Sequence, residues 1–455
     1  MKLNHVRPLT LDQLSRHLQA GGPSFFTSSK TSTVIPYDQL ELYLGSRNGM
    51  LDLVDLSLLP KNVDLTDATL DVTGPITWQE ARAFAQSKGR EILTSPTEEL
   101  AAMLAGIATS ATGERCFGFG SLRDQVAQLE YLDGNGARHL LRHDRLLKDR
   151  PEFADSHAKN ILERYQHSYT SYKNFKNAPF PRFERETDLM TGTEGQLGVI
   201  TQASFLTRPA TESTFLFLLL PKWETDFTRH LAVFNFVQSK RNMIYACELL
   251  DDQSLNVLPA HERPGRAGQD LIFLEIDSYH LDQFMGDFAD LTDLIGEDNI
   301  FEISRQKCRE LRMLVPRATF EANSRMGVIK MGTDVQMPPE HFSLLLEFYR
   351  ECSQIGLSYN LFGHFGDAHL HFNFLPTKEQ IPLAEKMLDR LYAMVASWSG
   401  SPFAEHGVGL IKQKYMRHFY QKVHFEMFDY LKKCFDPKNQ FFPLGFMSLK
   451  LEARP

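Results

Sequence analysis

Residues 191–201 read Thr-Gly-Thr-Glu-Gly-Gln-Leu-Gly-Val-Ile-Thr, with glycine at every third position before an apolar run typical of a β-strand. The dinucleotide-binding fingerprint of α/β proteins needs a strand first, then glycines, then a helix, so this run has the wrong context for that motif. Glycines without a Cβ still allow backbone N–H groups to approach a ligand closely. On spacing alone, the run predicts either a tight loop between two elements or a backbone cradle for a ligand.

Strands and helices alternate on both sides of this run, which predicts an α+β fold. Thr10 and Thr77 each have Gln or Glu three positions later and predict capped helices that end near Gly21 and Gly89. Residues 137–187 are polar and aromatic without a clear period, and they predict no element. The other expected elements are strands at 51–56, 68–72, 126–132, 199–206, 214–220 and 271–276, and helices at 339–355, 381–398 and 412–434.

Length and composition limit the classes of protein. A chain of 455 residues is expected to form two domains of roughly 200 residues each. The net charge of −8, from 49 basic and 57 acidic residues without long runs, argues against a dedicated nucleic-acid binder. No apolar run has signal or membrane-spanning length, so we expect a cytoplasmic protein, with peripheral membrane association left open. The five scattered cysteines, without a CxxC, exclude a conventional iron–sulfur site in this chain.

Residues 363–374, Gly-His-Phe-Gly-Asp-Ala-His-Leu-His-Phe-Asn-Phe, concentrate histidines in one short stretch. Alternation predicts a strand with His369, His371 and Asn373 on one face and apolar side chains on the other. A glycine turn would return His364 beside His371. Imidazoles bind borderline divalent metals, and Glu405 could supply the carboxylate that usually completes such a site. Any one histidine is more often a structural residue than a ligand, so both interpretations stay open at this point.

The run 191–201 resembles the glycine-rich signature of the FAD-binding domain of vanillyl-alcohol oxidase type flavoproteins. That resemblance implies non-covalent FAD, with the Ser/Thr-rich loop 27–33 at the pyrophosphate where the family is commonly glycine-rich. Met103 and Ala105 also stand where the family usually has Thr and Gly. The implied FAD-binding residues are Thr27, Ser28, Ser29, Lys30, Thr31, Ser32, Pro96, Gly106, Ser110, Gly113, Gly120, Glu194, Gly195, Gly198, Val199 and Ile200.

The second half of the chain resembles the D-lactate dehydrogenase, glycolate oxidase and D-2-hydroxyglutarate dehydrogenase branch of that family. The resemblance implies His364, His371 and Glu405 as ligands of a divalent metal, Zn or Mn/Fe. It further implies a base, a substrate contact and two cations for the substrate carboxylate, which are His406, Asn373, Arg312 and Lys330. Ala368-His369 stands where the branch usually has Gly-Asn.

The implied fold is a two-subdomain FAD-binding domain over 1–209, an α+β cap with an antiparallel sheet and helices over 210–410, and a C-terminal helix and tail over 411–455 that return to the FAD domain. The implied activity is metal-assisted oxidation of a small 2-hydroxy acid, with hydride transfer to flavin N5. The reduced flavin would be reoxidised by a separate electron-transfer protein, a quinone or oxygen. A homodimer is possible. The alternatives are a flavoprotein acting on a sugar or aldonolactone, and a non-catalytic flavin-fold subunit.

Overall fold

The computed structural model describes residues 2–44, 49–66, 68–94, 96–328 and 330–449. The chain forms two compact units. Unit 1 comprises residues 1–112, 121–210 and 405–455, and unit 2 comprises residues 113–120 and 211–404. The segment 113–120 is therefore a short excursion of the chain into unit 2. The functions predicted for the domains stay predictions.

Unit 1 begins with a three-stranded parallel sheet in the order β1-β3-β2, where β1 is Lys2–Val6, β3 is Met50–Asp55 and β2 is Ser24–Thr27. Helix α1 (Leu11–Ala20) begins at Thr10, whose side chain accepts a hydrogen bond from the Gln13 N–H as predicted. Helix α2 (Leu40–Leu44) follows β2. Phe25, Leu40, Leu51 and Phe442 are buried together in the core beside this sheet.

The second sheet of unit 1 is antiparallel and supports the glycine run. Its strand order is β4-β5-β9-β7-β8, with β6 also paired to β9. Its strands are β4 (Asn62–Leu65), β5 (Thr69–Thr73), β6 (Arg90–Ile92), β7 (Val126–Leu132), β8 (Arg138–Arg142) and β9 (Val199–Pro209). The predicted capping box at Thr77 and Glu80 is present and begins α3 (Trp78–Ser87). Helix α4 (Met103–Thr109) follows it.

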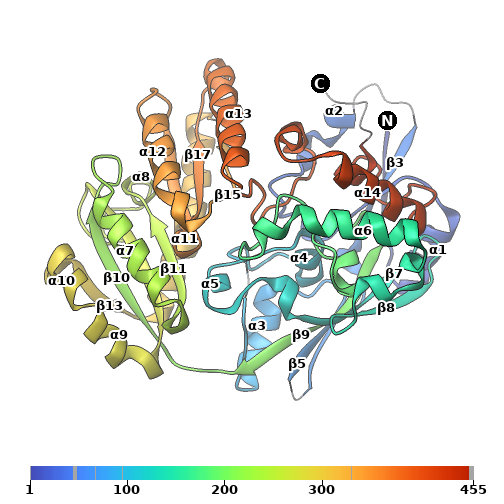
Figure 1. The fold of residues 1–455 in the computed structure, drawn as a ribbon, viewed down its shortest axis with the longest axis horizontal. Helices are drawn as coiled ribbons and strands as arrows, with labels where there is room; N and C mark the ends of the chain where they lie inside the picture. The colour runs from blue at the N-terminus through green and yellow to red at the C-terminus, as the bar shows by residue number, and fades with distance from the viewer. Residues whose placement is uncertain (1, 45–48, 67, 95, 329, 450–455) are drawn as a thin grey trace. The chain divides into compact units, whose positions relative to one another are not determined.

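The segment for which no element was predicted contains a 13-residue helix, α6 (Ser156–Ser168), capped by Asp155. It packs against α14 (Lys422–Phe435) of the same unit, as Figure 1 shows. Tyr165 of α6 lies in a buried aromatic cluster with Phe183, His424 and Phe428. Burial lowers the pKa of His424 to about 4. Tyr165 therefore takes part in the interface of α6 and α14, and the buried residues Ala158, Ile161, Leu162 and Tyr165 follow a helical period that the prediction missed.

Unit 2 is an eight-stranded antiparallel sheet with helices, in agreement with the predicted cap (Figure 1). The strand order is β13-β10-β12-β11-β16-β17-β14, and β15 also pairs with β17. The strands are β10 (Ser213–Pro221), β11 (Ile244–Leu250), β12 (Gln269–Asp277), β13 (Ile300–Ile303), β14 (Met331–Gly332), β15 (Val335–Gln336), β16 (Tyr359–His364) and β17 (His369–Phe374). The helices are α5 (Cys116–Phe119), α7 (Thr228–Ser239), α8 (Asp252–Leu255), α9 (Leu281–Asp287), α10 (Ala289–Ile295), α11 (Arg305–Met326), α12 (Phe342–Ser353) and α13 (Ile381–Ser397).

One helix boundary differs clearly from the prediction. The helix expected over 412–434 begins only at Lys422, and Gln413–His418 forms a 3-10 segment. The cause is a cap: the Gln421 N–H donates to Nδ1 of His424 and fixes the helix start there. Four of the five cysteines are buried, as expected for small apolar residues, and Cys434 is exposed. In the part of the chain that the structure describes, no helix is both long and apolar enough to cross a membrane.

Candidate functional site

Strands β16 and β17 bring three histidines onto one face of the sheet in unit 2. The register pairs His364 with His369 and Phe362 with His371, and cross-strand partners share a face. The ring centroids lie 5.1 Å apart for His364 and His369, 4.7 Å for His369 and His371, and 5.9 Å for His364 and His371. All three side chains are buried. The predicted strand at 369–374 is confirmed, and it pairs with a strand that the sequence analysis did not predict.

Hydrogen bonds fix the orientation of each ring. Nδ1 of His364 lies 2.7 Å from Oε1 of Glu248, and Nδ1 of His371 lies 3.1 Å from the backbone oxygen of Thr333. Nε2 of His369 lies 3.0 Å from Oδ1 of Asp334. Carboxylates and carbonyls only accept, so the N–H of each neutral ring is on these nitrogens. The lone pair of each imidazole is therefore on the opposite nitrogen, where a metal would bind.

This arrangement fits a divalent metal. The ligand nitrogens of the three histidines lie within 4.8 Å of one another. Acceptors on the second ring nitrogen, such as Glu248, are the outer partners that orient metal-bound histidines in proteins. The structure adds His369 to the predicted pair of His364 and His371. Glu405 is the first residue of the third segment of unit 1 and follows Ala404, whose N–H donates to the backbone oxygen of Asp334 at 3.1 Å.

Two predicted substrate-binding cations also belong to unit 2. Arg312 on α11 forms an ion pair with Glu114. Burial alone would lower the pKa of Arg312, but the negative charges of Glu114 and Glu248 outweigh it and raise the pKa. Lys330 is exposed, with Nζ 5.8 Å from the ring centre of Phe362, the cross-strand partner of His371. The Arg312 guanidinium thus lies in the field of the carboxylate that orients His364.

Asn373, the predicted substrate contact, is buried on β17, the strand that carries His369 and His371. Its Nδ2 donates to Oδ1 of Asn360 at 2.8 Å across the strand pair. Its Oδ1 would lie only 2.6 Å from a Cβ at Gly332, a position that also approaches Cε of Lys330 at 3.4 Å. The absence of a side chain at Gly332 therefore lets Lys330 and Asn373 lie near each other. The Asn373 amide is already held by a hydrogen bond within unit 2.

The glycine run in unit 1 forms a tight loop that leads into β9 and is hydrogen-bonded to α4. The Gly192 N–H donates to the Ile107 oxygen at 3.0 Å, and the Glu194 N–H donates to the Ala108 oxygen at 2.7 Å. A Cβ at Gly198 would lie 2.5 Å from the Tyr131 ring, so close packing requires glycine there. Gly195 has a φ of +69°, and no other atom lies within 4 Å of its Cβ position. Open space beside left-handed backbone fits a ligand that approaches the main chain closely.

Glu194 has a contact that its position in the glycine run did not suggest. Its carboxylate accepts hydrogen bonds from the N–H of Val408 at 2.6 Å and of Gly409 at 3.1 Å. Burial raises the pKa of this carboxyl to about 7, although these N–H groups and Lys412 act in the opposite direction. The Leu410 N–H in turn donates to the Val34 oxygen at 3.0 Å. The segment directly after His406 is therefore held by the glycine loop and by the end of the loop 27–33.

The loop 27–33 is largely exposed and has few contacts of its own. Thr27 is buried at the end of β2, whereas Ser29, Lys30 and Thr31 are exposed. Lys30 has a φ of +56°, and its Nζ lies 3.7 Å from Oδ2 of Asp55. Burial, which would raise the pKa of Asp55, is outweighed by hydrogen bonds from Ser57 and by Lys30, so the pKa is lowered. The predicted phosphate cation thus has a carboxylate neighbour.

The remaining predicted FAD-binding residues lie at four kinds of position. Gly106 gives room to the Trp78 indole, 3.1 Å from its Cβ position, and Ser110 has a φ of +50° with Oγ bonded to Asn177. Gly113 and Gly120 are the ends of the excursion into unit 2. Ser28 and Ser32 are half-buried in the loop, and Pro96 lies before α4. Val199 and Ile200 begin β9 and pair with β7.

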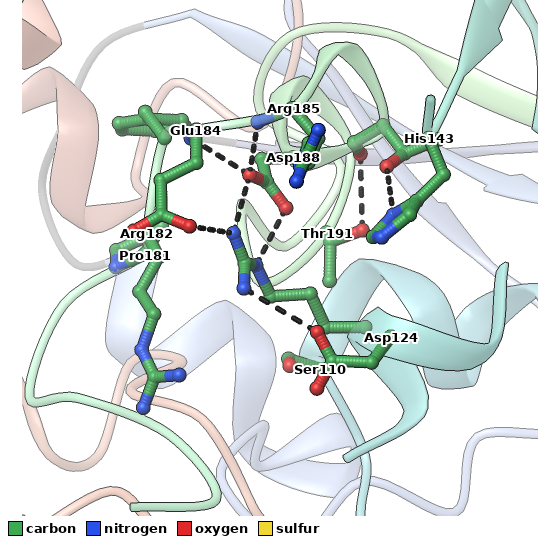
Figure 2. A network of polar contacts seen from close by, with 12 residues as sticks. Ser110, Asp124, His143, Pro181, Arg182, Glu184, Arg185, Asp188 and Thr191 are labelled. Atoms are coloured by element: carbon green, nitrogen blue, oxygen red, sulfur yellow. Dashed lines mark hydrogen bonds and ion pairs between the residues drawn. The ribbon is translucent and has the colours of Figure 1, made fainter. Parts of the chain in front are cut away.

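A buried charge network supports this region of unit 1. Arg123 binds Asp188 through Nε at 2.7 Å and through Nη2 at 2.8 Å, and it also contacts Glu184 at 3.2 Å. The Asp188 carboxylate further accepts the N–H groups of Glu184 and Arg185. Figure 2 shows Asp188 between these partners, with His143 and Thr191 beside them. Burial would lower the pKa of Arg123, but Asp188 raises it on balance. The sequence analysis assigned no role to this network.

Comparison with known proteins places these features in a family. Residues 224–444 match the model of the C-terminal domain of FAD-linked oxidases. Over this range the chain is similar to FAD-linked oxidases. The resemblance stated from the sequence is thereby confirmed. A D-2-hydroxyglutarate dehydrogenase of Xanthomonas citri pv. viticola is 26% identical over 400 residues, which cover 81% of this chain and 74% of that protein.

Other relatives resemble the chain over a smaller share of their own length. The mitochondrial D-2-hydroxyglutarate dehydrogenase of Danio rerio is 25% identical, covering 73% of this chain and 57% of that protein. The glycolate oxidase subunit of Bacillus subtilis is 23% identical, covering 56% and 55%. The chain thus spans little more than half the length of these two relatives. An alkyldihydroxyacetonephosphate synthase structure matches with a TM-score of 0.66 at 12% identity, covering 96% of this chain and 75% of that one, which confirms the fold.

Proposed function

We propose that this FAD-linked oxidase family member oxidises a small 2-hydroxy acid to the 2-oxo acid. The observation that carries the proposal is the buried cluster of His364, His369 and His371, whose ligand nitrogens lie within 4.8 Å of one another. Arg312 is in the field of Glu248, the hydrogen-bond partner of His364. Metal-ligating nitrogens and a carboxylate-binding cation together suit a substrate with a hydroxyl next to a carboxylate. Relatives named as D-2-hydroxyglutarate dehydrogenase and glycolate oxidase subunit support the same substrate class.

The proposed metal ligands are His364, His371 and Glu405, with His369 as an additional imidazole. Glu405 directly follows Ala404, whose N–H is hydrogen-bonded to the backbone oxygen of Asp334. Nitrogen and carboxylate donors suit Zn, Mn or Fe. A bound divalent ion would lower the pKa of the substrate hydroxyl. Glu248 and Asp334 would fix the tautomer and orientation of the His364 and His369 rings for binding.

FAD is proposed to bind unit 1 through its backbone cradle. The open main chain at Gly195, and the hydroxyl and N–H groups of the loop 27–33, are suitable donors for a flavin and a pyrophosphate. Bound FAD would accept the hydride from C2 of the substrate. Glu194 would contribute by fixing the segment 408–409 rather than by contacting the flavin.

Chain residues would perform the remaining steps. Arg312 and Lys330 would bind the substrate carboxylate, Arg312 through its planar fork and Lys330 as a point charge. His406 would take the hydroxyl proton as the hydride leaves C2. Asn373 would contact the substrate from the strand face that carries His371. A separate electron-transfer protein, a quinone or oxygen would then receive the electrons from the reduced flavin.

An anaerobic screen of D- and L-2-hydroxy acids, with and without chelator, tests the proposal. We expect one enantiomer to bleach the visible absorbance of the flavin, and the chelator to slow the reaction strongly. His406→Ala should retain flavin but lose bleaching, whereas His261→Ala, at an exposed histidine, should behave as wild type. Bleaching by a sugar or aldonolactone in a metal-free protein would favour that alternative. A colourless protein that cannot be reconstituted with FAD would favour a non-catalytic subunit.

A further inference from the structure

The predicted substrate arginine is already paired with a carboxylate of the chain. Glu114 contacts the Arg312 guanidinium, and the two side chains are 20% and 14% exposed. Arg312 also lies over the Phe273 ring, 5.7 Å from its centre. Glu114 belongs to the excursion 113–120, which runs from unit 1 into unit 2 directly after Thr112. The pair therefore joins two segments that are distant in sequence, within one unit.

The backbone that carries Glu114 is firmly anchored. Its neighbour Arg115 binds Glu275 through two hydrogen bonds of 3.1 and 3.0 Å. The Arg115 guanidinium also lies 5.0 and 5.2 Å from the ring centres of Phe119 and Tyr245. A Cβ at Gly118 would lie 2.8 Å from Tyr245 Cα, so the segment packs directly on β11. Because Arg115 and Gly118 hold the main chain after Glu114, release of Arg312 would involve rotation of the Glu114 side chain.

We propose that the Glu114 carboxylate competes with the carboxylate of the substrate for Arg312. This proposal rests on the function proposed above. A substrate carboxylate would replace the Glu114 carboxylate one for one. The exchange leaves no uncompensated charge on Arg312, because one carboxylate leaves as another arrives and Glu248 remains nearby. Glu114 would then rotate toward solvent, to which it is already partly exposed.

Such competition lowers the affinity for carboxylates relative to uncharged ligands. An internal carboxylate has an effective concentration of the order of millimolar or higher, since it is held on the same chain. A simple monocarboxylate only replaces one ion pair with an equal one and gains little. A ligand with a second donor beside its carboxylate gains further contacts and displaces Glu114 more readily. The apparent affinity for every carboxylate is the intrinsic affinity multiplied by the fraction of molecules in which Glu114 does not occupy Arg312.

Oxalate, which has two carboxylates and is not oxidised by hydride transfer, is a direct probe. We would measure its binding by isothermal titration calorimetry to wild type, Glu114→Gln and Glu310→Gln, with metal content matched. Glu310 is on the same helix as Arg312 and 53% exposed, so its variant makes the same change in net charge. We expect Glu114→Gln to bind oxalate about tenfold more tightly or better. Glu310→Gln should stay within about twofold of wild type.

Oxalate binding that is no tighter in Glu114→Gln than in Glu310→Gln overturns the proposal. Glu114→Asp, which withdraws the charge by one methylene, should give an intermediate affinity for oxalate. If Glu114→Gln does not fold, Glu114→Asp takes its place in the test. Methyl lactate, which lacks the carboxylate charge, should bind equally to wild type and variant. Tighter oxalate binding without flavin reduction by any 2-hydroxy acid would refute the proposed function and leave the role of Glu114 intact.

Discussion

The histidine strands of unit 2 and the loop 27–33 of unit 1 are both predicted to hold a charged group, yet they are built differently. His364, His369 and His371 are buried, and each has one ring nitrogen fixed by an acceptor. Lys30 is 37% exposed and has one long contact of 3.7 Å to Asp55. The first site is organised before any ligand arrives, whereas most of the loop is in contact with water.

This difference determines how much each side chain contributes. Buried groups with fixed partners lose little entropy on binding and act in a low dielectric, so single substitutions have large effects. An exposed ion pair contributes about 0–1 kcal/mol and is screened by salt. Loss of one buried histidine should therefore outweigh loss of Lys30 by a wide margin. Four substitutions test that ranking.

The largest effect is expected for His371→Ala. A structural zinc site contributes about 10–16 kcal/mol over four ligands, so one ligand accounts for roughly 3–4 kcal/mol. We expect Zn²⁺ affinity, measured by competition with a chelator, to fall by about a hundredfold to a thousandfold. His261→Ala, at an 81% exposed histidine, should leave it unchanged. Equal affinity in both variants would show that the histidine strands hold no metal.

Glu194→Gln tests whether unit 1 also contains a buried group with a large energetic effect. The folded-state pKa of about 7 lies above the usual 4.5 of a glutamate, so its contribution to stability is complete below about pH 4.5 and is lost as the pH rises to 7. The wild type should lose up to about 3 kcal/mol over this window. In Glu194→Gln that loss should disappear, as measured by urea unfolding at several pH values.

An exposed glutamate of α6 provides the control for this pH effect. Glu163→Gln should unfold with the same pH dependence as the wild type. If Glu194→Gln follows the wild-type curve as well, the Glu194 carboxyl does not titrate near neutral pH. The contact from Glu194 to Val408 and Gly409 would then be made by the charged form throughout.

Glu248→Gln should have an intermediate effect on the metal site. The amide can no longer fix the N–H of His364 on Nδ1 by its charge, and loss of such outer partners typically weakens metal binding by about 10- to 100-fold. Chelator competition measures the change. Glu302→Gln, at an exposed position of β13, should have no effect. A loss as large as that of His371→Ala would instead mean that Glu248 is itself a ligand.

Lys30→Ala should have the smallest effect. We expect its affinity for FAD, followed by flavin fluorescence, to fall by less than about tenfold and the difference to shrink at high salt. Lys88→Ala, at an exposed lysine beyond α3, should match the wild type. A loss above about a hundredfold would contradict the ranking, because Lys30 would then contribute as much as a buried group.

Predictions from local patterns agree well with the structure where the chain acts on its nearest neighbours. The capping box at Thr77, the strand from Val126 to Leu132 and the alternation from His369 to Phe374 are all present. These features depend on periods of two or on contacts three residues apart, which a sequence displays directly. Helix α6 was not predicted, although its buried residues Ala158, Ile161, Leu162 and Tyr165 recur at helical spacing; its partner α14 lies far away in the sequence.

The sequence by itself determined the α+β class, the glycine loop and the presence of two histidines in one strand. Only the tertiary structure decided what those groups contact. Glu248 orients His364, Glu194 holds the segment after His406, and Glu114 occupies Arg312. Each partner is far away in the sequence and is selected by the packing of strands and loops, which no local period encodes. The chemistry of the site depends on these long-range pairs, because they set charge, tautomer and access.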